Sequence, residues 1–354
     1  MSHSGQTGSK ARGFSLIELM VSIVLGMIIL AGATSIYLAS KRSMTEGEQV
    51  AAVSENGRFA LQLLNTAVRH VGFFGGSNPA DIREDGSLGA VTGDCTGDAV
   101  AYDTDNAMFA VRTTSASILG CIDDAYLGPD GNGTDVLVIK GVAPSPLFDA
   151  DPDDPSATRD GVISFPTGLN AEDVYVIANS ESGILLDGAG TAPSVSVGTE
   201  FAQGVAWPYR MQIYYIRQPV GGGAPRLSRK VLQWDSTAGA MAVVTQDLVM
   251  GVENIRYLFG YDSDNDGEVD TLANAETMTT EASLDAEAWD RILSLQVFML
   301  VRSDVADPNY TDEKTYNLGD IPFTPSGDER NFRRILLNTD IAMRNPRLVL
   351  RGGA

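Results

Sequence analysis

The longest apolar segment of the chain lies close to its N-terminus. From Leu19 to Ala39 the sequence runs for 21 residues without a charge, and Lys41 and Arg42 follow. A helix of that length spans the roughly 30 Å of hydrocarbon in a bilayer. A secretory signal peptide has a shorter apolar core with a small-residue cleavage site after it, and this sequence has neither. The segment therefore predicts a membrane-spanning helix.

One charge, Glu18, lies at the start of the apolar stretch, and a short polar leader with Lys10 and Arg12 precedes it. A carboxylate in hydrocarbon is costly unless it finds a partner, so an intramembrane glutamate is a functional candidate. The simpler interpretation is an interfacial charge that reaches for lipid headgroups. The position of Glu18 alone leaves both interpretations open.

The residues around Glu18 favour a functional role. Gly13-Phe14-Ser15-Leu16-Ile17-Glu18 resembles the cleavage motif of type IV prepilins, in which a glycine precedes an aromatic residue and a glutamate follows in the mature chain. The resemblance implies that a prepilin peptidase cuts between Gly13 and Phe14 and N-methylates Phe14. The protein would then cross the bacterial inner membrane once, with a periplasmic head that later reaches the pilus on the cell surface.

The resemblance also implies a role for Glu18 in assembly. Its carboxylate would face the positive N-terminal amine of a neighbouring subunit. Two opposite charges in a low-dielectric helix bundle neutralise each other and fix the axial register of the two subunits. The implied partners are the prepilin peptidase, the inner-membrane pilus assembly machinery, other minor and major pilins, and a tip adhesin.

The helical periodicity continues beyond the membrane segment, because apolar residues recur at spacings of three and four. One helix is expected from about residue 14 to about residue 70, ending before Gly72, Gly75 and Gly76. The predicted stripe consists of Val50, Val53, Gly57, Leu61, Leu64, Val68 and Val71. The expected parts of the chain are a cleaved leader (1–13), a transmembrane and filament-core helix (14–40), an amphipathic continuation (41–72) and a globular head (73–354).

The head reads as β-rich. Short β-branched and aromatic runs alternate with clusters of Gly, Pro, Asp and Asn. The expected fold class is α+β, with the long N-terminal helix packed on an antiparallel sheet. Polar segments near 77–107, 144–160 and 303–331 predict long surface loops. The predicted strands lie at 135–139, 174–177, 211–216, 292–301 and 335–337.

Parts of the head resemble the PilW-type minor pilins. The residues that carry this resemblance are Asp135-Val136-Leu137, the segment from Gly251 to Ile255, the loop from Tyr261 to Asp270 and the closing Arg344-Asn345-Pro346. They cover about a third of the head, and the loops between them are longer than this family implies.

The clearest candidate for a metal-binding site in the head is an acidic loop at 262–270. Alternating carboxylates with a glycine at the sixth position suit Ca²⁺, which prefers hard oxygen ligands around a tight turn. The twelfth position is Ala273 in place of the bidentate glutamate of an EF-hand, so the loop is closer to the short calcium loops of secreted modules. A solvated acidic hairpin tip is the alternative. The candidate ligands are Asp262, Asp264, Asp266, Glu268 (through its backbone carbonyl) and Asp270, with Val269 as an anchor to the sheet.

A second acidic cluster, at Asp149, Asp151, Asp153 and Asp154, contains prolines and no turn glycine. A solvated loop is the better interpretation there.

Charge and cysteine content restrict the function further. The formal net charge of −21 argues against a nucleic-acid partner, which needs a basic surface. Cys95 and Cys121 are the two cysteines, and an even pair in an exported domain predicts one disulfide. Two free thiols remain the alternative for a chain that stays in the cytosol. The bridge would contribute roughly 3 to 4 kcal/mol by the chain-entropy estimate.

No catalytic motif appears. The leader contains His3, and His70 is the only other histidine; no P-loop, nucleophile elbow or zinc spacing is present. The sequence therefore predicts a protein that is not an enzyme. The leading hypothesis is a minor pilin that primes assembly of a type IV pilus and lies at or near its tip. A type II secretion pseudopilin is one alternative, and an adhesin displayed at the tip is another.

Overall fold

The computed structural model describes residues 13, 15–147, 168–218, 221, 223–285 and 287–343. The chain forms two compact units, Met1–Ala51 and Ala52–Ala354. Phe14, the acidic cluster at 149–154 and the closing segment at 344–346 lie outside the described residues.

The first element, α1 (Leu16–Val68), is one α-helix of 53 residues, which confirms the helix predicted over about 14–70. In the first unit its large apolar side chains are all exposed, from 43% at Val50 to 77% at Leu16. Such a surface is unstable in water, so it needs hydrocarbon or other helices to cover it. Among the described helices, α1 is the one long and apolar enough to cross a membrane.

The last turns of α1 belong to the second unit and bury a narrow stripe. The buried residues are Val53, Gly57, Ala60, Leu64 and Val68. A Cβ atom at Gly57 would lie 2.3 Å from the Cδ1 atom of Leu337, so any larger residue at this position has to displace the end of that side chain. The predicted stripe is confirmed for most positions, but Val50 is 43% exposed and Ala60 takes part instead of the half-buried Leu61.

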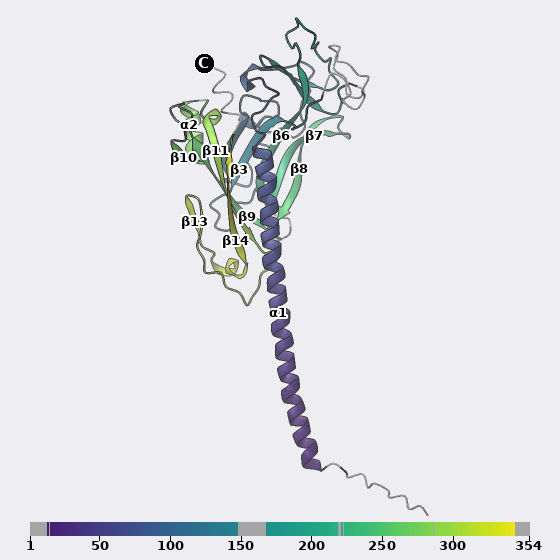
Figure 1. Ribbon diagram of the computed structural model, residues 1–354, viewed down its shortest axis with the longest axis vertical. Coiled ribbons are helices and arrows are strands. Elements are labelled where there is room, and N and C mark those ends of the chain that lie inside the picture. The colour runs from purple at the N-terminus through teal and green to yellow at the C-terminus, as the bar shows by residue number, and fades with distance from the viewer. Residues whose placement is uncertain are drawn as a thin grey trace, which may run out of the picture. The chain divides into compact units, whose positions relative to one another are not determined.

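The larger of two sheets has eight strands, which confirms a β-rich head (Figure 1). The order β1-β5-β4-β6-β3-β2 is extended by β7 on β6 and by β8 on β7. The long β6 holds the sheet together, since its first residues pair with β4 and its later ones with β3 and β7. The strands are β1 (Ile82–Glu84), β2 (Met108–Arg112), β3 (Asp135–Val142), β4 (Val174–Ala178), β5 (Gly183–Asp187), β6 (Val205–Arg217), β7 (Arg226–Asp235) and β8 (Ala240–Met250).

The second sheet has the order β10-β9-β11-β14, and all its pairs are antiparallel. Every residue of β9 is buried, so this strand lies at the centre of the core. Side chains of α1 and of both sheets form one hydrophobic core. The strands are β9 (Val252–Tyr261), β10 (Thr271–Asn274), β11 (Ile292–Arg302) and β14 (Arg334–Ala342), and α2 (Ala275–Leu284) follows β10.

The predicted α+β class is confirmed, with three differences in detail. The head has two main sheets in place of one, and β1 pairs with β5 in parallel. A separate hairpin of β12 (Tyr316–Leu318) and β13 (Ile321–Phe323) lies in a segment predicted as loop. The short 3-10 helices are η1 (Pro79–Asp81), η2 (Gly97–Ala99), η3 (Ala288–Arg291) and η4 (Gly327–Asn331).

Two of the three predicted surface loops are partly buried. In 77–107, Ala99 and Ala101 are fully buried. In 303–331, Leu318 and Phe323 bury a small apolar cluster against Leu300 of β11. Single apolar residues between polar ones give no periodic signal, so the sequence pattern predicted solvated loops for these segments. Of the third segment, residues 144–147 are described, and Leu147 forms a β-bridge with Ala206.

Asp290 makes the head's stability depend on pH. Burial raises the pKa of Asp290 to about 6, and the Glu287 and Asp105 carboxylates act in the same direction. A carboxyl whose folded pKa lies above its unfolded value stabilises the fold while it is protonated, and that contribution is lost as the pH rises through about 6.

We therefore expect Asp290→Asn to raise the free energy of unfolding by up to about 3 kcal/mol at pH 8, at roughly 1.4 kcal/mol per pKa unit. The gain should be about half as large at pH 5, where the wild-type carboxyl is mostly protonated. Thermal unfolding of the purified full-length protein in detergent measures both values. An equal gain at the two pH values would contradict the assignment.

Candidate functional site

The N-terminal end of α1 carries the predicted processing and assembly residues. Gly13 and Ser15 precede the helix and are exposed. Glu18 lies in the first turn, where its Oε2 atom accepts a hydrogen bond from the Ser15 N–H at 3.0 Å. The Ser15 hydroxyl in turn accepts from the Ile17 N–H at 3.2 Å. Each side chain therefore satisfies a backbone donor that the helix start leaves unpaired.

This arrangement resembles a capping box, and the sequence analysis missed it. Its signal was present, because Ser15 and Glu18 have the S-x-x-E spacing. A carboxylate in the first turn also interacts favourably with the positive end of the helix dipole. Glu18 thus stabilises the helix start within its own chain. A second role, in pairing with a neighbouring subunit, stays a prediction.

The acidic loop joins β9 to β10 at an edge of the smaller sheet. Asp262 is fully buried, and its two oxygens accept from the Asp266 N–H at 3.2 Å and the Gly267 N–H at 2.7 Å. Asn265 and Gly267 have positive φ angles of 63° and 88°, a conformation that Gly and Asn adopt most readily. The carboxylate of Asp262 therefore shapes the turn from inside.

The far side of the loop is closed by Asp270. Its Oδ2 atom accepts from the Ser263 N–H at 2.8 Å and from the Ser263 hydroxyl at 2.6 Å. These bonds lower the pKa of Asp270, since they favour its charged form. Val269 lies against β9 as predicted, because a Cβ atom at Gly260 would be 3.2 Å from both of its methyl carbons.

Three of the five predicted calcium ligands converge. One oxygen from each of Asp262, Asp264 and Asp270 lies within 4.8 Å of the others. Asp266 and Glu268 are outside this group, and the Asp266 carboxylate accepts from the Glu268 N–H at 2.8 Å. Asp262, Asp264 and Asp270 are each partly engaged by the loop's own donors, but each carboxylate oxygen has two lone pairs. The donor set therefore fits a hard cation.

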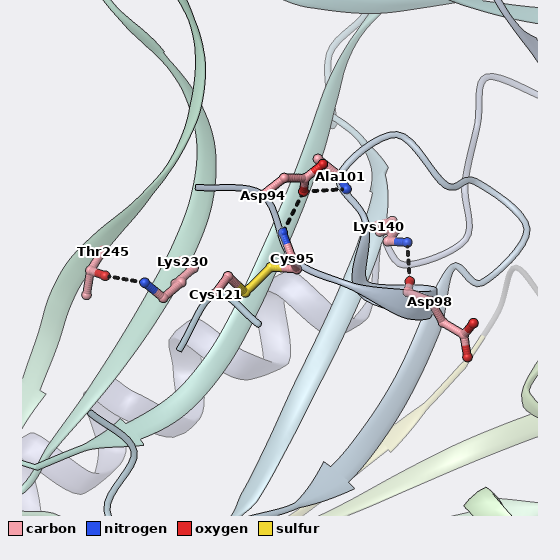
Figure 2. The surroundings of a disulfide bond; sticks show 8 residues. All are labelled: Asp94, Cys95, Asp98, Ala101, Cys121, Lys140, Lys230 and Thr245. Atoms are coloured by element: carbon pink, nitrogen blue, oxygen red, sulfur yellow. Dashed lines mark hydrogen bonds between the residues drawn. A yellow bond between two sulfur atoms is a disulfide. The ribbon is translucent and has the colours of Figure 1, made fainter. Parts of the chain in front are cut away.

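The predicted disulfide between Cys95 and Cys121 is formed, with a Cα–Cα distance of 4.6 Å. Figure 2 shows that polar contacts hold the segment after Cys95 in place. The Asp94 carboxylate accepts from the N–H groups of Cys95 (2.7 Å) and Ala101 (3.0 Å). The buried Lys140 donates to the Asp98 carbonyl oxygen at 2.6 Å. The bridge thus ties a loop that sequence reasoning placed on the surface to the core of the head.

Removal of this bridge should destabilise the head. For the double variant Cys95→Ser/Cys121→Ser we expect a loss of about 3.5 kcal/mol in the free energy of unfolding, because a bridge across 26 residues restricts the unfolded chain. Denaturant unfolding of the full-length protein in detergent measures it. Wild-type protein treated with reductant is the control and should lose a similar amount, whereas the variant should not respond. Equal stability of variant and wild type would contradict the prediction.

The comparisons with known proteins agree with this geometry. The family described as type IV pilus-assembly protein W matches residues 213–345. The prokaryotic N-terminal methylation motif matches residues 8–34, which contain the predicted cleavage site and Glu18. No curated protein and no solved structure gives a significant match.

The N-terminal part of the chain therefore resembles type IV prepilins, with a methylation motif and an apolar helix that fit an inner-membrane anchor. The second half of its head resembles the PilW type of minor pilin. That match contains β9 and the acidic loop, whereas Asp135-Val136-Leu137 lies outside it. The two matches together support a structural protein that is related to type IV pili.

Proposed function

We propose that this chain is a minor pilin that helps to start assembly of a type IV pilus and lies at or near the pilus tip. The observation that carries the proposal is a pilin stem joined to an unusually large head. The head unit begins at Ala52 and contains two sheets, a separate hairpin and a disulfide-linked segment. A head of this size packs poorly into the repeating shaft of a filament, which favours the end of the pilus.

The stem supplies the expected partners. Prepilin peptidase cuts between Gly13 and Phe14, and the mature chain stays in the inner membrane before assembly, with its head in the periplasm. The inner-membrane assembly machinery and other minor and major pilins then meet the apolar surface of α1, whose side chains are fully available. The match to pilus-assembly protein W favours a pilus over a type II secretion system.

Deletion of the gene tests the proposal. We expect surface pili to disappear or to become rare, with recovery when the full-length chain is supplied from a plasmid. The major pilin should stay abundant in the membrane, because assembly and not synthesis is affected. Normal pilus numbers in the deletion strain would refute a priming role. Normal numbers together with lost surface attachment would support the adhesin alternative.

The acidic loop is proposed to bind one Ca²⁺ ion through Asp262, Asp264 and Asp270. The convergence of these carboxylates supports it, as does the exposure of Asp264 and Asp270 to solvent. Weak calcium sites of extracellular modules have Kd values of about 10⁻⁴ to 10⁻³ M. The ion would tie the β9–β10 turn together and neutralise part of its negative charge.

We expect 10 mM Ca²⁺ to stabilise the full-length protein by about 1.5 to 3 kcal/mol, the linkage value for a ligand at 10 to 100 times its Kd. Asp264→Ala should abolish most of this gain. Asp130→Ala is the matched control, since Asp130 also accepts hydrogen bonds within a tight glycine turn and lies elsewhere on the head. Thermal unfolding with and without Ca²⁺ measures the gain. Equal gains in the two variants would place the effect outside this loop.

A further inference from the structure

A groove runs beside the last turns of α1, between this helix and the strands β3, β6 and β7. It encloses about 270 Å³ and belongs entirely to the head unit. We call it the α1–β7 groove. Its helix side includes Phe59, Leu63 and His70, and its sheet side includes Arg210, Gln212 and Arg229.

The two arginines of the groove differ from the other arginines of the head's strands. Nine arginines lie in those strands, and seven of them form ion pairs with carboxylates. The two that form none within the described residues are Arg210 and Arg229. Arg229 donates to the amide oxygen of Gln246 at 3.0 Å. Glu172 and Asp173 line an adjoining hollow together with both arginines but form no ion pair with either of them.

This pattern is unexpected for a chain of net charge −21, which has 46 acidic and 25 basic side chains. Two arginines that form no ion pair within the described residues are therefore an exception in this chain, although Glu172 and Asp173 line the adjoining hollow with them. Their guanidinium groups keep donors that suit planar carboxylates. These donors can therefore bind acidic groups of another molecule.

The opposite wall of the groove is apolar. Phe59 is 51% exposed, although it belongs to the part of α1 that lies in the head unit, and Leu63 and Ala67 are half-buried beside it. An exposed aromatic ring next to unpaired arginines is the usual composition of a protein contact centre, where aromatic residues and arginine are enriched. The groove thus fits a segment with both an apolar and an acidic side chain.

We propose that the α1–β7 groove binds an acidic peptide segment of another pilus subunit. Its carboxylates pair with Arg210 and Arg229, and an apolar side chain packs on Phe59. The inference depends on the proposed function only for the source of this segment. The charge of the groove would also attract a phospholipid headgroup, and the experiment below separates the two.

Photo-crosslinking in piliated cells tests the groove. Phe59 of the full-length chain is replaced by p-benzoylphenylalanine, the cells are irradiated, and the crosslinked peptides are sequenced by mass spectrometry. We expect a peptide of another subunit with Asp or Glu within a few residues of the crosslink. Arg210→Glu should lower the yield about tenfold, the scale expected when an ion pair becomes a like-charge contact. Arg210→Lys should keep most of it.

Arg58→Glu is the matched control, because Arg58 is exposed on the same helix and does not line the groove. It should leave the yield unchanged. Equal amounts of each variant with an intact Cys95–Cys121 bridge show that the head is folded. The proposal is overturned if only lipid is crosslinked, if the peptide lacks acidic residues, if no crosslink forms, or if Arg210→Glu has no effect.

Pilus counts in the deletion strain keep this test separate from the proposed function. If pilus counts are normal in the deletion strain and the crosslink to an acidic segment is weakened by Arg210→Glu, the priming role is refuted and the binding proposal is supported. If pili are lost but Arg210→Glu does not change the crosslink yield, only the binding proposal is refuted.

Discussion

Glu18→Ala is expected to reduce the number of surface pili at least about tenfold, while the protein stays in the membrane at its normal level. Removal of one partner from a buried ion pair costs about 3 to 5 kcal/mol. A tenfold change in an equilibrium constant needs only about 1.4 kcal/mol. In this account the lost partner is the carboxylate that faces the N-terminal amine of a neighbouring subunit. Pili counted by electron microscopy in the complemented deletion strain give the result.

Ser15→Ala is the matched control, because the structure also gives Glu18 a role within its own chain. The serine hydroxyl accepts the other hydrogen bond of the helix start. Its removal weakens the cap by about 1 kcal/mol but leaves the carboxylate of Glu18 in place. We expect nearly normal pili in this variant. Equal loss in the two variants would reduce Glu18 to a capping residue, and normal pili in Glu18→Ala would contradict its role in assembly.

The largest loss of stability in the head is expected from Glu253→Ala. The Arg334 guanidinium binds both oxygens of Glu253, at 2.6 and 2.8 Å, and both side chains are fully buried. Glu329 approaches the same guanidinium at 3.0 Å and Asp312 at 3.5 Å. The network joins β9 and β14 to the segment that contains the β12–β13 hairpin.

Glu253→Ala leaves a buried arginine without its bidentate partner, so we expect a loss of about 3 to 5 kcal/mol. For a head of this size that corresponds to a fall of roughly 5 to 8 °C in Tm. Thermal unfolding of the full-length protein in detergent measures the loss.

Glu200→Ala serves as the control for a solvent-accessible pair. Glu200 binds Arg83 at 3.0 Å, and the two side chains are 51% and 56% exposed. Pairs of this kind contribute about 0 to 1 kcal/mol, so the loss should be small. A loss below about 1 kcal/mol for Glu253→Ala as well would mean that the buried network is no stronger than a surface pair.

The stem could be predicted from sequence because its signals are local. The position of the helix is predicted by a charge-free run, a glycine–phenylalanine boundary and apolar residues at spacings of three and four. α1 ends within two residues of the expected position. The strands at 135–139 and 292–301 were also found, since runs rich in apolar residues mark them. The strands β7 and β8 were missed, because polar residues interrupt both.

The rest of the head depends on contacts between distant residues. β1 pairs with β5 about a hundred positions along the chain, and a three-residue strand has no periodicity of its own. The pairing of Arg334 with Glu253 is likewise invisible in a sequence rich in both residue types. The acidic loop was recognised from its spacing, but which carboxylates converge depends on the turn at Asn265 and Gly267.

The mass of the mature chain tests the central claim most directly. Intact-mass and peptide analysis of the protein purified from membranes should show a chain that begins at N-methylated Phe14 and contains the Cys95–Cys121 bridge. The leader of residues 1–13 should be absent in cells with an active prepilin peptidase and present when that enzyme is deleted. A mature chain that begins at Met1, with an unmodified Phe14, would contradict the assignment as a pilin.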